Sequence, residues 1–244
     1  MDQFGQGFAT HWDELVGWDK RAAADTDFLL GLVRRFKCQR ILDVALGTGF
    51  HSIELMRAGL TVKALDISQS MIDVARKNAE NVGFLLDAVR TDWVNMPGSL
   101  LGKFDCIICL GNSLACEMNV GKRQVAIQNW CNALNDGGIV IVDRRNYETL
   151  LSGEKYSGSN GQYFGDTVKI GFTKITRDET VFSYTFADGR TFSLVMFPIQ
   201  DPEMRTNFLD VGMTAVEEYG DRKLSHQSKD VSFYTYVFRK LRKP

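Results

Sequence analysis

The stretch from residue 41 to residue 50, Ile-Leu-Asp-Val-Ala-Leu-Gly-Thr-Gly-Phe, constrains the fold of this chain more than any other. Its first half is short, apolar and partly β-branched, which predicts a buried strand. Gly47 and Gly49 let the backbone turn sharply around Thr48 and lie close to a ligand, because they lack a Cβ. Apolar residues then recur at helical spacing over 50–58, so free N–H groups at the start of that helix point toward the turn. This order of elements is typical of nucleotide-binding units.

An acidic residue on the next strand strengthens this prediction. Gly-x-Gly alone lacks the third glycine of a dinucleotide fingerprint and the Gly-Lys-Ser/Thr of a phosphate loop. The segment 61–65 predicts a second strand, and Asp66 follows at its tip, about 20 residues after the turn, where such folds hold a ribose diol. Alternatively, Asp66 only caps the helix that begins near Ser68. With the glycine turn in place, ribose binding is the favoured interpretation.

Strands and helices alternate from residue 40 onward, which indicates parallel strands joined by right-handed crossovers. We expect strands at 41–44, 61–65, 86–91, 104–110 and 139–143, and helices at 28–36, 50–58, 68–82 (capped by Ser68) and 122–134, with a turn at 135–138. Ligands bind at the carboxyl ends of such strands. Those ends carry Ala45, Asp66, Asp92, Gly111-Asn112 and Arg145-Asn146.

The pattern changes after Tyr147. Residues 152–166 are rich in Gly, Ser and Tyr and predict a mobile loop. Alternating strands follow at 167–173, 181–186 and 191–197, the last two joined by an Asp-Gly hairpin turn at 187–190. A helix at 202–211 and strands at 215–219 and 233–239 complete the chain. We therefore predict a single α/β domain over 1–244: a Rossmann-like, doubly wound sheet of seven strands with the last antiparallel, and an inserted antiparallel sheet within 152–200.

The N-terminal segment is rich in aromatic residues at helix-like spacing, including Phe4, Phe8, Trp12 and Trp18. It is either an edge helix packed on the core or a flap over a cofactor, in which Phe4 and Trp12 exclude water. Both interpretations stay open at this point.

Composition excludes several classes of function. The net charge is −1 and the signs are interspersed, so a nucleic-acid partner is not expected; the basic residues 239–243 indicate a solvated tail. We see no apolar run long enough for a bilayer and no signal peptide, so we expect a cytoplasmic protein without a membrane partner. The five cysteines predict reduced core or pocket residues, and no metal site, because Cys106 and Cys109 share one strand and no second pair exists.

Five stretches carry a resemblance to a known family: 8–16, 42–52, 107–113 (Ile-Ile-Cys-Leu-Gly-Asn-Ser), 145–147 (Arg-Asn-Tyr) and 196–198 (Met-Phe-Pro). Together they resemble class I S-adenosylmethionine-dependent methyltransferases. More narrowly, they resemble the glycine N-methyltransferases and the microbial glycine/sarcosine N-methyltransferases that make betaine. The Gly-Thr-Gly turn is shared by many methyltransferases, whereas Leu-Gly-Asn-Ser with Arg-Asn-Tyr is much more specific.

The resemblance implies S-adenosylmethionine as cofactor and a small-molecule amine as substrate, and it is compatible with a homo-oligomer. It implies a cofactor site made of Phe4, Trp12, Arg21, Ala45, Gly47, Asp66, Ile67, Met71, Asp92, Trp93 and Leu110. On the substrate side, Asn112 and Arg145 would hold the carboxylate of a small amino acid. Tyrosines, with Tyr147, Tyr163 and Tyr184 as candidates, would shape the amine pocket.

The chemistry of these residues supports the substrate side independently. An arginine fork matches a carboxylate, and Arg145 lies at a strand end beside a polar Asn146. The alternatives are a surface salt bridge for Arg145 and a simple turn contact for Asn112. Arg144 is expected to face solvent or pair with an acid. Met196 and Phe197 are expected in the core on strand alternation.

Three positions depart from the family pattern. Cys116 stands where a histidine normally faces the substrate, Leu46 replaces a threonine or cysteine in the cofactor turn, and Phe4 replaces an opening tyrosine. Cofactor use is compatible with these changes, while glycine as the substrate is less secure.

The implied reaction is direct displacement at the sulfonium methyl by an unprotonated amine, with Arg145 and Asn112 fixing the amine in line. Tyrosine hydroxyls would orient the amine. We find no clear partner for His11, His51 or His226, so the amine would lose its proton to water before the N-terminal segment and residues 152–166 close the site.

Three functions stay open. The first is an N-methyltransferase acting on glycine, sarcosine or both. The second is a methyltransferase of the same build acting on another small molecule, such as the amino or ring nitrogen of a natural-product intermediate, which Cys116 favours. The third is a non-catalytic sensor of S-adenosylmethionine, for which Arg145 and Asn112 would be unneeded.

Overall fold

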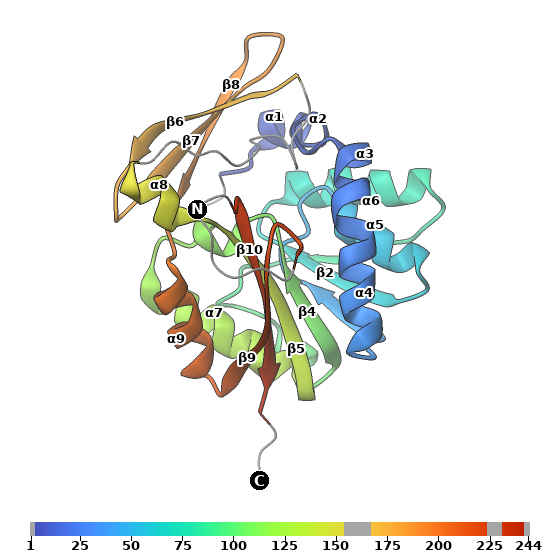
Figure 1. Ribbon diagram of the computed structural model, residues 1–244. Coiled ribbons are helices and arrows are strands. Elements are labelled where there is room, and N and C mark those ends of the chain that lie inside the picture. The colour runs from blue at the N-terminus through green and yellow to red at the C-terminus, as the bar shows by residue number, and fades with distance from the viewer. Residues whose placement is uncertain (1–2, 154–166, 224–230, 242–244) are drawn as a thin grey trace.

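A twisted sheet of seven strands forms the centre of the protein (Figure 1). The computed structural model describes residues 3–153, 167–223 and 231–241. The strands are β1 (Arg40–Asp43), β2 (Thr61–Asp66), β3 (Asp87–Arg90), β4 (Phe104–Cys109), β5 (Leu134–Arg145), β9 (Met213–Gly220) and β10 (Phe233–Lys240). Their spatial order is β3-β2-β1-β4-β5-β10-β9. The first five are parallel, and β10 runs antiparallel between β5 and β9. The predicted fold class is confirmed.

Helices cover both faces of this sheet (Figure 1). One face carries α4 (Asp27–Arg35), α5 (Phe50–Arg57) and α6 (Gln69–Asn81), and the other carries α7 (Val120–Ala133) and α9 (Asp201–Leu209). Short helical pieces complete the described chain: α1 (Gln6–Ala9), α2 (Trp12–Val16), α3 (Trp18–Arg21), a π-helix η1 (Ala22–Thr26), α8 (Tyr147–Ser152) and the 3₁₀ turns η2 (Gly98–Leu100) and η3 (Ser113–Cys116). In the part of the chain that the structure describes, no helix is both long and apolar enough to cross a membrane.

Burial on both faces explains why the central strands are continuously apolar. On β4 and β5, Ile107 and Val140 pack into the cluster beneath α7 and α9. Their neighbours Ile108 and Ile141 pack into the cluster beneath α4. These residues are fully buried, so the sheet is held from both sides and its carboxyl-end loops rest on a rigid base.

A separate small antiparallel sheet lies beyond the carboxyl ends of the main strands (Figure 1). It consists of β6 (Lys169–Ile175), β7 (Thr180–Thr185) and β8 (Thr191–Met196), in the predicted place. The N-terminal segment is attached to it, because the Gln3 side chain donates to the Val195 carbonyl at 2.9 Å and accepts from its N–H at 2.7 Å. Phe8 also stacks on Phe192 at 4.8 Å. Most of the loop predicted at 152–166 lies outside the described residues.

Local details differ from the sequence-based prediction in three places. The turn predicted at 135–138 is wrong: these residues belong to β5, where Leu134 pairs with Phe104 ahead of a shift in register. The N-terminal helix is divided into short pieces, and Gly17 joins α2 to α3 with a φ of 59°. Ser68 precedes α6 but makes no cap bond, because its hydroxyl donates to the Phe4 carbonyl at 2.9 Å.

Candidate active site

Two adjoining cavities open at the carboxyl ends of the parallel strands. The larger cavity has a volume of about 270 Å³ and lies at the glycine turn. The smaller cavity has a volume of about 50 Å³ and lies toward β5, β7 and β10. Both are lined by Trp12, Val16, Arg21 and Gly111. Ligands in the two cavities would therefore be neighbours.

The glycine turn and Asp66 form the floor of the larger cavity. Gly47 and Gly49 have φ values of 54° and 95°, which glycine adopts without strain. Asp66 accepts the Gly47 N–H at 2.8 Å with one oxygen and the Ser68 N–H at 2.9 Å with the other. The carboxylate thus shapes the turn, supports the start of α6 and lines the cavity, so the two interpretations of Asp66 are compatible.

A second carboxylate supports the turn from beneath. Asp43, at the end of β1, accepts the Ser52 hydroxyl at 2.8 Å and the Ala45 N–H at 3.1 Å. It is only 2% exposed. Burial raises the pKa of Asp43 from 3.8 to about 6, although these hydrogen bonds oppose the change.

The far wall of the larger cavity comes from the segment after β3. Trp93 donates its indole N–H to the Val44 carbonyl at 2.5 Å. Asn95 bonds to Asp92 through its backbone and its side chain. Burial by itself would raise the pKa of Asp92, but these hydrogen bonds hold it below its ordinary value.

All the residues predicted to bind the cofactor line this one cavity: Phe4, Trp12, Arg21, Ala45, Gly47, Asp66, Ile67, Met71, Asp92, Trp93 and Leu110. The structure brings them together from five separate segments. Their contacts with a bound cofactor stay a prediction.

Arg145 lies on the wall of the smaller cavity and is only 5% exposed. Its guanidinium contacts two rings, 5.2 Å from the centre of Phe182 and 4.7 Å from that of Phe233. Such contacts fix the orientation of a cation before any ligand arrives. The alternative of a surface salt bridge for Arg145 is wrong.

Asn112 fixes the backbone beside Arg145. Its φ of 62° is in the left-handed region, and its N–H donates to the Asp143 carboxylate at 2.7 Å. Its side-chain oxygen accepts the Arg145 N–H at 3.0 Å, and its side-chain nitrogen donates to the Tyr147 hydroxyl at 2.7 Å. Asn112 therefore makes contacts well beyond its own turn, while its contact with a substrate carboxylate stays a prediction.

The candidate tyrosines lie in different places. Tyr184 lines the smaller cavity. Tyr147 is fully buried behind Asn112 and contacts that residue rather than the cavity itself. Burial raises the pKa of both phenols above their ordinary value, so both hydroxyls keep their protons. Tyr163 lies outside the described residues.

Other neighbours of the cavities were also considered in the sequence. Arg144 is buried and pairs with Glu148 at 2.6 Å, so the expected acidic partner is confirmed and the solvent-facing alternative is wrong. Met196 is buried as predicted, and it also lines the smaller cavity. Cys116 lies on the wall of the larger cavity, and burial raises the pKa of its thiol to about 12, so it is not a thiolate at neutral pH.

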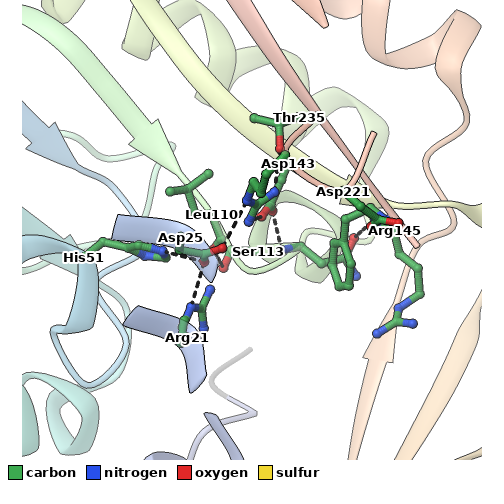
Figure 2. A network of polar contacts seen from close by, with 12 residues as sticks. Arg21, Asp25, His51, Leu110, Ser113, Asp143, Arg145, Asp221 and Thr235 are labelled. Atoms are coloured by element: carbon green, nitrogen blue, oxygen red, sulfur yellow. Dashed lines mark hydrogen bonds and ion pairs between the residues drawn. The ribbon is translucent and has the colours of Figure 1, made fainter. Parts of the chain in front are cut away.

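A buried network of charges was not predicted from the sequence (Figure 2). Asp25, on the π-helix, lies 3.1 Å from Arg21 Nε and 3.3 Å from His51 Nε2. Arg222 Nε lies 3.1 Å from the other Asp25 oxygen, and Arg222 Nη2 lies 3.4 Å from Asp143. The expectation that His51 has no partner is wrong. Arg21 and Asp25 are only four residues apart, but His51 and Arg222 lie 26 and 197 residues from Asp25, and no local pattern joins them to it.

The protonation states in this network follow from its charges. Burial alone would raise the pKa of Asp25, yet His51, Arg222 and Arg21 hold it well below its ordinary value. Burial and the charge of Arg21 lower the pKa of His51 from 6.5, so its ring is neutral at neutral pH. The network thus places the single ionised carboxylate of Asp25 beside two arginines and a neutral imidazole.

Comparisons with known proteins agree with this arrangement. Residues 41–138 match the family described as "Methyltransferase domain". A glycine/sarcosine N-methyltransferase of Halorhodospira halochloris is 35% identical over 240 residues, which are 98% of this chain and 89% of that protein. The human glycine N-methyltransferase is 35% identical over 69% of this chain and 62% of its own length. A methyltransferase structure from Clostridium acetobutylicum matches 96% of this chain and 98% of its own with a TM-score of 0.77 at 20% identity, and so shares its fold.

The matched methyltransferase domain and the relatives that cover nearly the whole chain identify an S-adenosylmethionine-dependent methyltransferase, and the fold and the paired cavities agree with this class. Within that class, the chain belongs to the family of the glycine/sarcosine N-methyltransferases. It is accordingly an N-methyltransferase.

Proposed function

We propose that this enzyme methylates the amine of a small amino acid, namely glycine, sarcosine or both. The observation that carries this proposal is the buried Arg145, in contact with the rings of Phe182 and Phe233 on the wall of a cavity of about 50 Å³. A fixed guanidinium in so small a space suits a compact acceptor with one carboxylate. The names of the relatives support the same acceptors.

The larger cavity fits S-adenosylmethionine by the chemistry of its walls. Asp66 and Asp92 offer acceptors for hydroxyl and amino groups, Ile67 and Met71 offer apolar surface for a base, and Arg21 offers a cation for a carboxylate. When bound, the cofactor supplies a methyl group activated by the positive charge of its sulfur. We propose that these residues hold it there.

The enzyme's own residues then act mainly by holding the acceptor and the cofactor in position. Arg145 would bind the acceptor carboxylate, and Asn112 keeps Arg145 and Tyr147 in place. The protonated hydroxyl of Tyr184 would orient the amine. Trp12 and Phe4 would exclude water from the larger cavity, because their side chains line it. They belong to the N-terminal segment, which Gln3 connects to the small sheet through a hydrogen bond to Val195.

Turnover tests this proposal directly. The enzyme is incubated with S-adenosylmethionine and separately with glycine, sarcosine, dimethylglycine or no acceptor, and the products are measured by mass spectrometry. We expect methylated glycine or sarcosine with an equal amount of S-adenosylhomocysteine. Turnover on neither amino acid would favour the second function, a different amine acceptor, for which the unusual Cys116 is the supporting observation.

Arg145→Gln sharpens the test. We expect KM for the amino acid to rise, or kcat/KM to fall, because the substrate carboxylate loses its cation. The change should correspond to a loss of binding free energy on the order of 2 kcal/mol or more. Binding of S-adenosylhomocysteine should stay within threefold. Arg190→Gln is the matched control, since Arg190 is an exposed arginine in the hairpin turn of the small sheet. Unchanged kinetics in Arg145→Gln would argue against an acceptor carboxylate at this site.

Two properties stay predictions: the cytoplasmic location and the assembly into a homo-oligomer. Light scattering of the purified enzyme would decide the second.

A further inference from the structure

A second arginine lines the smaller cavity beside Arg145. Arg222 lies in the turn after β9, and its side chain is only 8% exposed. We propose that Arg222 is a specificity-determining residue: with Arg145 it makes the smaller cavity select acceptors that carry a carboxylate. This inference rests on the proposed function and adds to it a residue from the C-terminal part of the chain.

The backbone holds Arg222 in an unusual conformation. Asp221 and Arg222 have φ values of 45° and 66°, a left-handed pair without glycine. The Asp221 carboxylate accepts the N–H groups of Ser232 and Phe233 at 3.0 to 3.1 Å, and its own N–H donates to the Phe233 carbonyl at 2.9 Å. Strain of this kind persists where surrounding bonds impose it, and it is concentrated at functional sites. Here it turns a long cationic side chain toward the interior.

Guanidinium groups predominate among the charged side chains that line the smaller cavity. Arg21, Arg145 and Arg222 line it, together with one carboxylate, Asp143. Asp25 adds a second carboxylate behind Arg21 and Arg222. Three guanidinium groups on the wall of one small cavity suit a ligand that carries a carboxylate.

Arg222 and Asn112 are both held by neighbouring residues, but only Arg222 brings a positive charge to the cavity wall. The Asn112 oxygen accepts from Arg145, and its nitrogen donates to Tyr147 and lies 3.0 Å from Met196 Sδ. Its side chain is thus engaged in holding the site together. The Arg222 guanidinium is fixed by Asp25, Thr235 and Asp143, which orients the planar fork at the cavity wall. A planar fork is what a carboxylate ligand requires.

The test compares two acceptors in Arg222→Gln and Arg222→Lys. Glycine carries the carboxylate, whereas glycinamide keeps the amine and replaces the carboxylate by an uncharged amide. The preference is the ratio of the two kcat/KM values; where glycinamide reacts too slowly, its inhibition constant against glycine is used in every variant instead. Arg190→Gln is the control, and binding of S-adenosylhomocysteine is measured in parallel.

We expect the preference for glycine to fall about 10- to 100-fold in Arg222→Gln and several-fold in Arg222→Lys, because a charge-assisted contact to the carboxylate is lost or loses its fork geometry. Binding of S-adenosylhomocysteine should stay within threefold. If Arg222→Gln does not fold, Arg222→Lys decides, since it keeps the charge that Asp25 and Asp143 need. A preference within twofold of the wild type in the folded variants, with both acceptors affected equally, would show that Arg222 is only structural. If the unaltered enzyme methylates neither glycine nor sarcosine, the proposed function fails, and this inference fails with it.

Discussion

At the scale of single residues, one carboxylate serves several purposes. Asp66 lies at the tip of β2, receives two backbone N–H groups and lines the larger cavity. Its position could be predicted, because an acidic residue at this offset from a glycine turn is a local feature of βαβ units. Arg222 could not be predicted, because its partner Asp25 is 197 residues away in the sequence.

Asp66→Asn should weaken cofactor binding. An asparagine presents an NH₂ group where the carboxylate accepts an N–H, so one of the two backbone bonds is lost together with the charge at the cavity. We expect the dissociation constant of S-adenosylhomocysteine to rise about 10- to 100-fold, measured by calorimetry. Asp87→Asn is the control, because Asp87 is an exposed carboxylate on the neighbouring β3. A change below threefold in Asp66→Asn would contradict the role of this carboxylate.

At the scale of elements, the glycine turn also determines how closely α5 and α6 pack. Gly49 begins α5 with a φ of 95°, and a Cβ added there would lie 3.1 Å from Ala75 Cβ on α6. The glycine therefore meets two requirements, a left-handed backbone and close contact between helices. At this scale the prediction from sequence was sound for α5, β1 and β2, whose signals are local. It failed at 135–138, where pairing of Leu134 with Phe104 on β4 extends the strand.

Gly49→Ala should destabilise the fold by more than its backbone strain alone. Left-handed strain costs about 1–2 kcal/mol, and the contact with Ala75 adds about 1–3 kcal/mol of overpacking. Gly83→Ala provides the comparison, because Gly83 has a φ of 84° but open space around its missing Cβ. Urea unfolding would measure both. Equal losses in the two variants would mean that α6 moves away without cost.

At the scale of the whole molecule, the buried Asp43 carboxylate lowers the stability of the fold at neutral pH, because burial favours its protonated form. The folded-state pKa of Asp43 is about 6, above its ordinary 3.8. Between these values the folded chain binds a proton that the unfolded chain has released. The contribution of protonated Asp43 to the stability of the fold is therefore complete below pH 3.8 and is lost as the pH rises through 6.

Asp43→Asn should remove this dependence. We expect the free energy of unfolding of the variant, relative to the wild type, to rise by about 3 kcal/mol between pH 4 and pH 7. Chemical denaturation at several pH values measures it. The buried His51 acts in the opposite direction, since its lowered pKa makes the folded state gain stability as the pH rises, but it is common to both proteins. If the difference in unfolding free energy between Asp43→Asn and the wild type does not change with pH, the raised pKa of Asp43 is contradicted.

The position of β10 has a consequence for biosynthesis. This strand enters between β5 and β9, although it is the last of the described strands to leave the ribosome. Until residues 233–240 emerge, the nascent chain displays the bare edge of β5, and β9 has no neighbour to join. Exposed edges of this kind favour aggregation and engage chaperones. The parallel strands β1 to β5 can form before β10 is made, whereas the smaller cavity gains Phe233 only when β10 has emerged.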